Sequence, residues 1–337
     1  MYEDILESRR LAFVRDGWAY GELMNRIGNP FTWVDGEQIE SIGSFASRVG
    51  LFQYLAMSGE IYPTPKDIYV NDHDEMEARI AKKLDKTIKK LVPFLTSLDI
   101  DYYIAGTANV KVQDYAAIRT WAKDLPREPR HLDVGPGLGA NAIYSTLGFN
   151  SYYISIEANP TSYDVQRQFL RTLTSDDEKF LDLVDCNSFG LSEGSIKKEL
   201  NSTNHYRFKL LPSWNFSFLD DSSIDLASAT WVLNEINQAG ISWLLHQISR
   251  CLKIGGYFYI RDSHLRKPMR HSLDYDVALG EIGFEQVAIL EVKNRINMHG
   301  IPRIYRKTQN IDLSFLEIFD KFFGKFAIGS HGGGFDN

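Results

Sequence analysis

The stretch His131-Leu-Asp-Val-Gly-Pro-Gly-Leu-Gly-Ala-Asn141 decides the fold of this 337-residue chain. Its first residues predict a short buried strand, and Gly135, Gly137 and Gly139 predict a tight turn into a helix. Glycine adopts positive φ and lets the main chain approach a ligand more closely than a Cβ atom would allow. Asp133 places a carboxylate at the carboxyl end of the strand. In an open α/β sheet, small cofactors bind at such a turn, because free N–H groups of the helix point at them.

The glycine spacing by itself fits two classes of cofactor. Gly135-x-Gly137-x-x-Ala140 matches the dinucleotide-binding pattern, which leaves an NAD-dependent oxidoreductase open. Asp133 separates the two classes, because a carboxylate repels a pyrophosphate and attracts a cationic amino-acid group. With its acidic-x-Gly-x-Gly-x-Gly form, the sequence resembles the class I S-adenosylmethionine-dependent methyltransferases. The resemblance implies that Asp133 lies near the methionine end of S-adenosylmethionine.

A second acidic residue follows the next predicted strand. The run Ser151 to Ile156 ends at Glu157, which lies 157 − 139 = 18 residues after the last glycine of the turn. This is close to the spacing of about 20 residues at which an acidic side chain meets a ribose diol. We expect Glu157, followed by Ala158, to contact the cofactor. The alternative is that Glu157 caps the helix that begins near Pro160.

The segment from Leu211 to Ile236 resembles the third and fourth strands of the same family, with the loops that follow them. By this resemblance, Leu211, Pro212 and Trp214 border the adenine, and the Trp214 ring could stack on it. A core position under a loop is an equally good interpretation of Trp214. The fourth strand, Ile224 to Ala229, leads into Thr230, where the resemblance places the cofactor beside the acceptor.

Later runs complete the predicted sheet. Leu244 to Gly256 is expected to be a helix ended by glycines, and Tyr257 to Arg261 a fifth strand. By resemblance, Phe284 to Val292 and Arg303 to Lys307 form the closing antiparallel hairpin. The predicted fold class is therefore α/β, a Rossmann-like, doubly wound, mostly parallel sheet of seven strands with an N-terminal helical subdomain.

The chain divides into three predicted parts. Residues 1–105 form a helical subdomain that acts as a lid or a dimer surface, residues 106–310 the methyltransferase domain, and residues 311–337 an amphipathic helix with a Gly-rich tail. In the first part, apolar residues recur at helical spacing from Ile80 to Leu91, and Pro93 should end or kink that helix. The last part carries a phenylalanine stripe that could dock on the body, form a homo-oligomer contact or touch a membrane, in that order of preference.

Candidate catalytic residues lie at the carboxyl ends of the fourth and fifth strands. Methyl transfer to an alcohol needs a base for the hydroxyl proton, and an imidazole titrates near neutral pH. His264 is therefore the first choice, with Asp262 and Glu235 either orienting it or together holding a divalent metal. The structural alternatives are that His264 is a loop histidine without a catalytic role and that Glu235 caps or salt-bridges a helix. Whether a metal is required stays open.

The acceptor is less well defined than the cofactor. The Asn/Asp-Pro-Pro-Tyr and Pro-Cys motifs of nucleic-acid methyltransferases are absent, since Ala229-Thr-Trp-Val and two unrelated cysteines occur instead. The region from Asp133 to Asp262 is similar to sugar O-methyltransferases of surface-glycan and natural-product pathways. This resemblance implies a hydroxyl of a nucleotide-linked or glycan sugar. A phenol, carboxyl or amine of another small metabolite is the first rival, and an interaction module that has lost catalysis is another.

Bulk composition sets broad limits. A net charge of −7 argues against nucleic acid as a partner. The two cysteines have no C-x-x-C partner, and the first residues carry acids where a signal peptide would need a basic region. No run approaches the roughly 20 apolar residues of a membrane span. We therefore expect a cytoplasmic enzyme acting on a small molecule or glycan.

Overall fold

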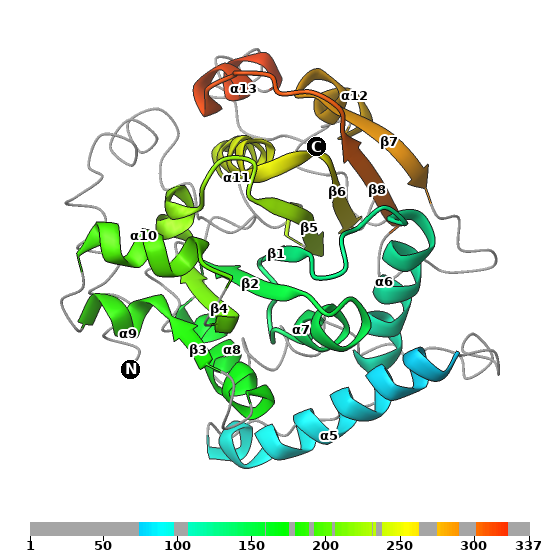
Figure 1. Ribbon diagram of the computed structural model, residues 1–337, viewed down its shortest axis with the longest axis vertical. Helices are drawn as coiled ribbons and strands as arrows, with labels where there is room; N and C mark the ends of the chain where they lie inside the picture. The colour runs from blue at the N-terminus through cyan, green and yellow to red at the C-terminus, as the bar shows by residue number, and fades with distance from the viewer. Residues whose placement is uncertain are drawn as a thin grey trace, which may run out of the picture.

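The computed structural model describes residues 74–97, 107–158, 160–174, 179–188, 192–203, 206–230, 232–233, 238–262, 275–289 and 301–322. In this part of the chain one sheet runs through the centre, with strand order β3-β4-β2-β1-β5-β6-β8-β7 (Figure 1). The first six of these strands pair in parallel, and β8 pairs antiparallel with both β6 and β7. The strands are β1 Arg130–Val134, β2 Tyr152–Glu157, β3 Lys179–Asp182, β4 Tyr206–Pro212, β5 Ile224–Thr230, β6 Leu252–Asp262, β7 Phe284–Ile289 and β8 Ile301–Lys307.

The predicted α/β class, parallel core and closing hairpin are confirmed, but the predicted number of seven strands is wrong. The described residues form eight strands, and the additional one is β3, at the edge beside β4. Its sequence, Lys-Phe-Leu-Asp, holds only two apolar residues between charged ones. A strand of four residues at the edge of a sheet can form without a longer run of apolar residues, because only one of its sides pairs with another strand. The sequence pattern is therefore too short to reveal it.

Helices cover both faces of the sheet. One face packs against α5, α6, the α7–η3 segment and α8, and the other against α10, α11, α12 and α13. Helix η4 contributes to both cores, with Trp214 on the first face and Phe216 and Phe218 on the second. In Figure 1, α5 runs along the bottom of the view and α13 lies at its top. The helices are α5 Glu75–Ser97, α6 Thr107–Trp121, α7 Asn141–Ile143, the π-helix η3 Tyr144–Gly148, α8 Pro160–Leu173, α9 Leu183–Ser188, α10 Glu193–Asn201, the 3₁₀ helix η4 Ser213–Phe218, α11 Gln238–Cys251, α12 Tyr275–Glu281 and α13 Phe315–Phe322.

Helix α5 lies against the sheet domain. The apolar residues of the predicted stripe, from Ile80 to Leu91, are each at most 1% exposed. Helix α5 packs against α6 and α8. Of the two predicted effects of Pro93, an end of the helix is excluded, because α5 continues to Ser97, and a kink stays a prediction. A proline removes one backbone hydrogen bond, and the tertiary packing of the stripe outweighs that loss here. The other helices predicted in residues 1–105 lie outside the described residues, so the subdomain boundary stays a prediction.

The end of α11 also differs from its prediction. The helix ends at Cys251, and Gly255 and Gly256 lie inside β6 instead of capping the helix. Gly255 has a φ of 85°, and the pairing of β5 with β6 shifts register between Ile224 and Leu226. A glycine in the left-handed region is as typical of a strand irregularity as of a helix end, so the sequence alone could not separate the two.

The predicted C-terminal helix is present as α13, and it docks on the body of the protein. Phe315, Ile318 and Phe319 are buried, and α13 packs against α11. The remainder of the predicted helix, from residue 323 onward, lies outside the described residues. None of the described helices is long and apolar enough to cross a bilayer.

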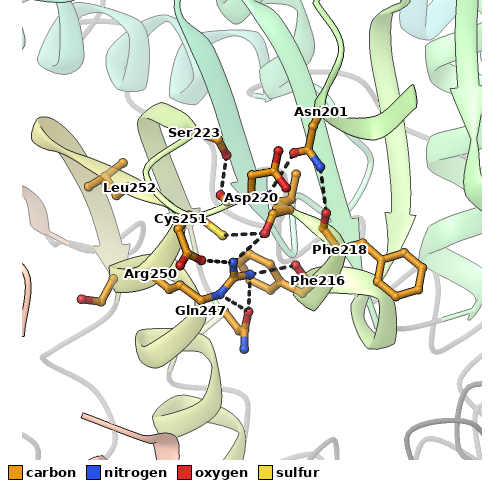
Figure 2. Close-up of polar contacts among 12 residues, drawn as sticks. Asn201, Phe216, Phe218, Asp220, Ser223, Gln247, Arg250, Cys251 and Leu252 are labelled. Carbon is orange, nitrogen blue, oxygen red and sulfur yellow. Dashed lines mark hydrogen bonds and ion pairs between the residues drawn. The ribbon is translucent and has the colours of Figure 1, made fainter. Parts of the chain in front are cut away.

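An arginine on α11 fixes the far end of η4, the helix that follows β4. Figure 2 shows the Arg250 side chain reaching from α11 to the residues that follow η4. Its Nη1 donates to the Leu219 carbonyl at 2.6 Å and to Asp221 at 2.5 Å. On the other side, Asn201 donates to the Phe218 carbonyl at 2.9 Å (Figure 2). These contacts satisfy carbonyls that a helix end leaves without intrahelical partners. The end of η4 is therefore held by α11 on one side and by α10 on the other.

Candidate functional site

Strand register brings the predicted cofactor residues together at the carboxyl ends of the parallel strands, which form one edge of the sheet. Val134 of β1 pairs with Ile156 of β2 and with Ala229 of β5. Glu157 is opposite Pro212, and Thr230 is opposite Arg261. Because parallel strands end at the same edge, the turn after β1 lies among the ends of β2, β4, β5 and β6 (Figure 1). This is the position at which an open α/β sheet binds small ligands.

The three glycines of the turn adopt the left-handed conformation that the sequence predicts. Their φ angles are 58° at Gly135, 61° at Gly137 and 83° at Gly139. The Gly135 amide donates to the carbonyl of Ile156 at 2.8 Å, which ties the start of the turn to β2. A Cβ atom on Gly135 would lie 2.5 Å from Cγ2 of Val232. Both the backbone conformation and the space at Gly135 therefore exclude other residues.

Asp133 is completely buried and accepts three side-chain hydrogen bonds. Ser228 and Asn141 donate to Oδ1 at 2.7 and 3.2 Å, and Tyr153 donates to Oδ2 at 2.6 Å. Burial raises the pKa of Asp133 to about 6, against the opposing effect of these donors and of Lys111. Asn141 starts the helix after the glycine turn, so the carboxylate ties β1 to that helix. Both oxygens of Asp133 are buried, so the residue can influence a ligand at the carboxyl ends of the strands through its charge and not through a direct hydrogen bond.

A histidine on the same face of β1 completes this buried network. His131 Nδ1 lies 2.8 Å from Ser145 Oγ, and His131 Nε2 lies 2.8 Å from Ser228 Oγ. Because the Ser228 hydroxyl donates to Asp133, its oxygen can only accept from Nε2–H, so Ser145 donates to Nδ1. Burial lowers the pKa of His131 to about 3, and the ring is neutral at pH 7. Sequence reasoning treated His131 only as the start of the strand.

Glu157 lies at the end of β2, as predicted. Its Oε1 accepts from the Ala158 amide at 2.9 Å and its Oε2 from Gln166 Nε2 at 2.7 Å, and the residue is 6% exposed. Gln166 is on α8, and its amide oxygen accepts from Ser155. The carboxylate is therefore held in place at the edge by α8. This geometry is compatible with a ribose contact and with a purely structural link to α8.

The remaining predicted cofactor residues border the same edge from buried positions. Leu211 and Pro212 end β4, Thr230 ends β5, and all three are buried. Trp214 is 3% exposed and belongs to the core cluster on the α5–α6 face. The Trp214 ring is therefore part of the core in this structure, and its contact with adenine stays a prediction.

The predicted catalytic residues are described only in part. Asp262 is completely buried at the end of β6. His264 and Glu235 lie outside the described residues, so their roles stay predictions. His246 is on α11, where its Nδ1 lies 2.9 Å from the Leu313 carbonyl, beside α13. Among the described residues, no group of three or more His, Cys, Asp or Glu side chains could hold a metal ion.

A buried ionic cluster on α6 and β6 was not predicted. Asp114 Oδ1 accepts from Tyr259 at 2.5 Å and from Arg261 Nε at 2.6 Å, and its Oδ2 accepts from Arg261 Nη2 at 3.0 Å. Lys111, one turn before Asp114, has its Nζ 3.9 Å from Oδ2. The available signal was an arginine inside a predicted strand in the middle of the sheet, where charged residues need a partner.

Comparisons with known proteins give structural likeness only. No family model matches the chain, and no curated protein matches it. A geranyl diphosphate C-methyltransferase from Streptomyces coelicolor A3(2) covers 80% of this chain and 96% of its own, at 10% identity and a TM-score of 0.42. A phosphoethanolamine N-methyltransferase from Haemonchus contortus covers 77% of this chain and 56% of its own, at 12% identity and a TM-score of 0.39.

Both of these methyltransferase structures hold S-adenosylhomocysteine. The [4+2]-cyclase SpnF is similar to the chain to the same degree, at 14% identity and a TM-score of 0.41, covering 62% of this chain and 84% of its own. At such identities and scores, these likenesses carry no inference about activity.

Proposed function

We propose that the chain is an S-adenosylmethionine-dependent methyltransferase that acts on a hydroxyl of a sugar, either nucleotide-linked or part of a glycan. The observation that supports the cofactor is the pairing of two features at one edge. Three left-handed glycines follow β1, and Glu157 ends the neighbouring strand β2. A turn without Cβ atoms allows close approach to a ligand, and a carboxylate suits the two hydroxyls of a ribose.

The residues at this edge fit the cofactor in charge as well as in shape. Gly135, Gly137 and Gly139 would bring the main chain against it, and Glu157 would receive the ribose hydroxyls. Asp133 contributes a negative charge, which favours a sulfonium amino acid over a diphosphate. S-adenosylmethionine supplies an activated methyl group when bound. The protein then has to hold the acceptor oxygen in line behind that methyl group and exclude water.

Ligand binding tests the cofactor first. At a concentration one hundred times its Kd, S-adenosylhomocysteine should stabilise the protein by about 2.7 kcal/mol. For a domain of about 200 residues, this corresponds to a rise in Tm of roughly 5–10 °C by differential scanning fluorimetry. NAD should give no shift. A shift with NAD and none with S-adenosylhomocysteine would instead identify the glycine turn as a dinucleotide site.

Transfer to a hydroxyl also requires a base for the acceptor proton. His264 removes the acceptor proton, and Asp262 and Glu235 orient it or hold a divalent cation. His264→Ala should lower turnover by about 10²–10⁴-fold while the Kd of S-adenosylhomocysteine stays unchanged. His246→Gln, on α11 beside α13, is the matched control and should keep full turnover. Equal turnover in the wild type and His264→Ala would remove His264 from the mechanism.

The sugar acceptor is supported by the resemblance between Asp133 and Asp262, and the net charge of −7 argues against nucleic acid. A screen of labelled methyl transfer over sugar nucleotides, glycans, phenols, amines and carboxylic acids tests it directly. We expect label in a sugar, and label in phenols or amines alone would assign the protein to the rival class. Repeating the positive reaction with a chelator, and then with added Mg²⁺, tests the metal at Asp262 and Glu235.

A further inference from the structure

Helix α6 brings its first turns to the edge where the cofactor is proposed to bind. It runs antiparallel to β6: Tyr257, early in the strand, donates to Asp124 just after the helix at 3.5 Å, and Arg261, late in the strand, binds Asp114. Residues that precede Asp114 in α6 therefore lie toward the carboxyl end of β6. Lys111 is the charged residue of this part of the helix, one turn before Asp114.

Lys111 is a buried cation that makes no hydrogen bond with the described residues. Its side chain is 9% exposed, and its nearest described charged partner, Asp114 Oδ2, lies 3.9 Å from Nζ, beyond hydrogen-bonding distance. Asp114 is already neutralised by the two-point contact with Arg261, and it also accepts a hydrogen bond from Tyr259. Burial lowers the pKa of Lys111, with Asp114 opposing that effect. A largely buried ammonium whose nearest described carboxylate lies beyond hydrogen-bonding distance can donate to a further anionic group, and such an arrangement is typical of functional sites.

We propose that Lys111 binds the carboxylate of the amino-acid part of S-adenosylmethionine. The inference rests on the proposed function and adds a residue to the binding site. Lys111 lies toward the carboxyl end of β6, because it precedes Asp114 in α6, and Asp133 is the next-to-last residue of β1. The two side chains carry opposite charges, and Asp133 opposes the lowering of the Lys111 pKa. An amino-acid zwitterion carries the complementary pair of charges.

The charge balance favours this ligand group over a phosphate of the acceptor. Arg261 is paired with Asp114, so Lys111 is the one cation of this cluster that is not neutralised by a hydrogen-bonded carboxylate. Asp133 would repel a phosphate carrying two negative charges in a buried setting. A single carboxylate accompanied by an ammonium group adds no net charge to the cluster.

Calorimetric titration with two ligands tests the assignment. S-adenosylhomocysteine and its decarboxylated analogue differ only in the carboxylate. A hydrogen bond to a charged group is worth about 1.5–3 kcal/mol, so Lys111→Met should weaken S-adenosylhomocysteine by about 10–150-fold and the analogue by less than threefold. Lys111→Arg keeps the charge and should recover most of the affinity. Lys89→Met, on the exposed side of α5, is the control for a lost surface lysine.

The outcomes separate this inference from the proposed function. If the wild type binds neither ligand, the cofactor assignment itself is wrong. If it binds S-adenosylhomocysteine and Lys111→Met weakens both ligands equally, or neither, then Lys111 does not contact the carboxylate and the inference fails. Should Lys111→Met not fold, the wild type alone remains decisive, because equal affinity for the two ligands leaves no carboxylate contact to assign.

Discussion

Gly135→Ala should abolish binding of S-adenosylhomocysteine while leaving the protein folded. At a φ of 58°, an L-residue costs about 1–2 kcal/mol. The new Cβ would also lie 2.5 Å from Cγ2 of Val232, a β-branched side chain with few χ1 alternatives. The turn must therefore shift, and with it the amide that donates to Ile156. We expect the Kd measured by calorimetry to rise at least 100-fold.

Gly194→Ala is the matched control for this variant. Gly194 is in helix α10, where a Cβ atom would meet no atom within 4 Å. Replacing glycine by alanine inside a helix stabilises it by about 0.5–1 kcal/mol, so this variant should have a slightly higher Tm and an unchanged Kd. If Gly135→Ala binds the ligand as tightly as Gly194→Ala does, the cofactor does not approach the turn after β1.

The sequence was most informative where one residue type has few substitutes. Positive φ at Gly135, Gly137 and Gly139, and an acidic residue ending β2, follow from local requirements and were predicted. The closing antiparallel hairpin followed from family resemblance. Strand β3 and the course of α5 through Pro93 depend on long-range packing, which a short local pattern does not record.

The candidate site was predicted as a set of residues but not as a network. His131, Ser145 and Ser228 lie far apart in the chain and have no motif, yet they meet around Asp133 because β1 and β5 are neighbours. Lys111 was missed for the same reason, since its significance depends on α6 running antiparallel to β6. Sequence spacing identifies side chains on one element, whereas such clusters depend on which elements become adjacent.

His131 and Asp133 should make the stability of the protein respond to pH in opposite directions. Burial raises the pKa of Asp133 from 3.8 to about 6. Its contribution to stability is complete below pH 3.8 and is lost as the pH rises through 6. Burial lowers the pKa of His131 from 6.5 to about 3. Its contribution is present above pH 6.5 and is lost as the pH falls toward 3. Between pH 6 and 4.5 the two effects therefore oppose each other in the wild type.

Removing either group should uncover the other. Each pKa unit corresponds to about 1.4 kcal/mol, so between pH 6 and 4.5 each group changes the free energy of unfolding by about 1–2 kcal/mol. Relative to the wild type, His131→Gln should gain this amount on acidification, and Asp133→Asn should lose it. Urea unfolding at several pH values measures both differences, and all other titrating groups cancel in the comparison. Variants whose stabilities run parallel to the wild type across this range would show that neither buried group changes its protonation there. In that case, the charge of Asp133 at the edge of the sheet would not depend on pH between 4.5 and 6.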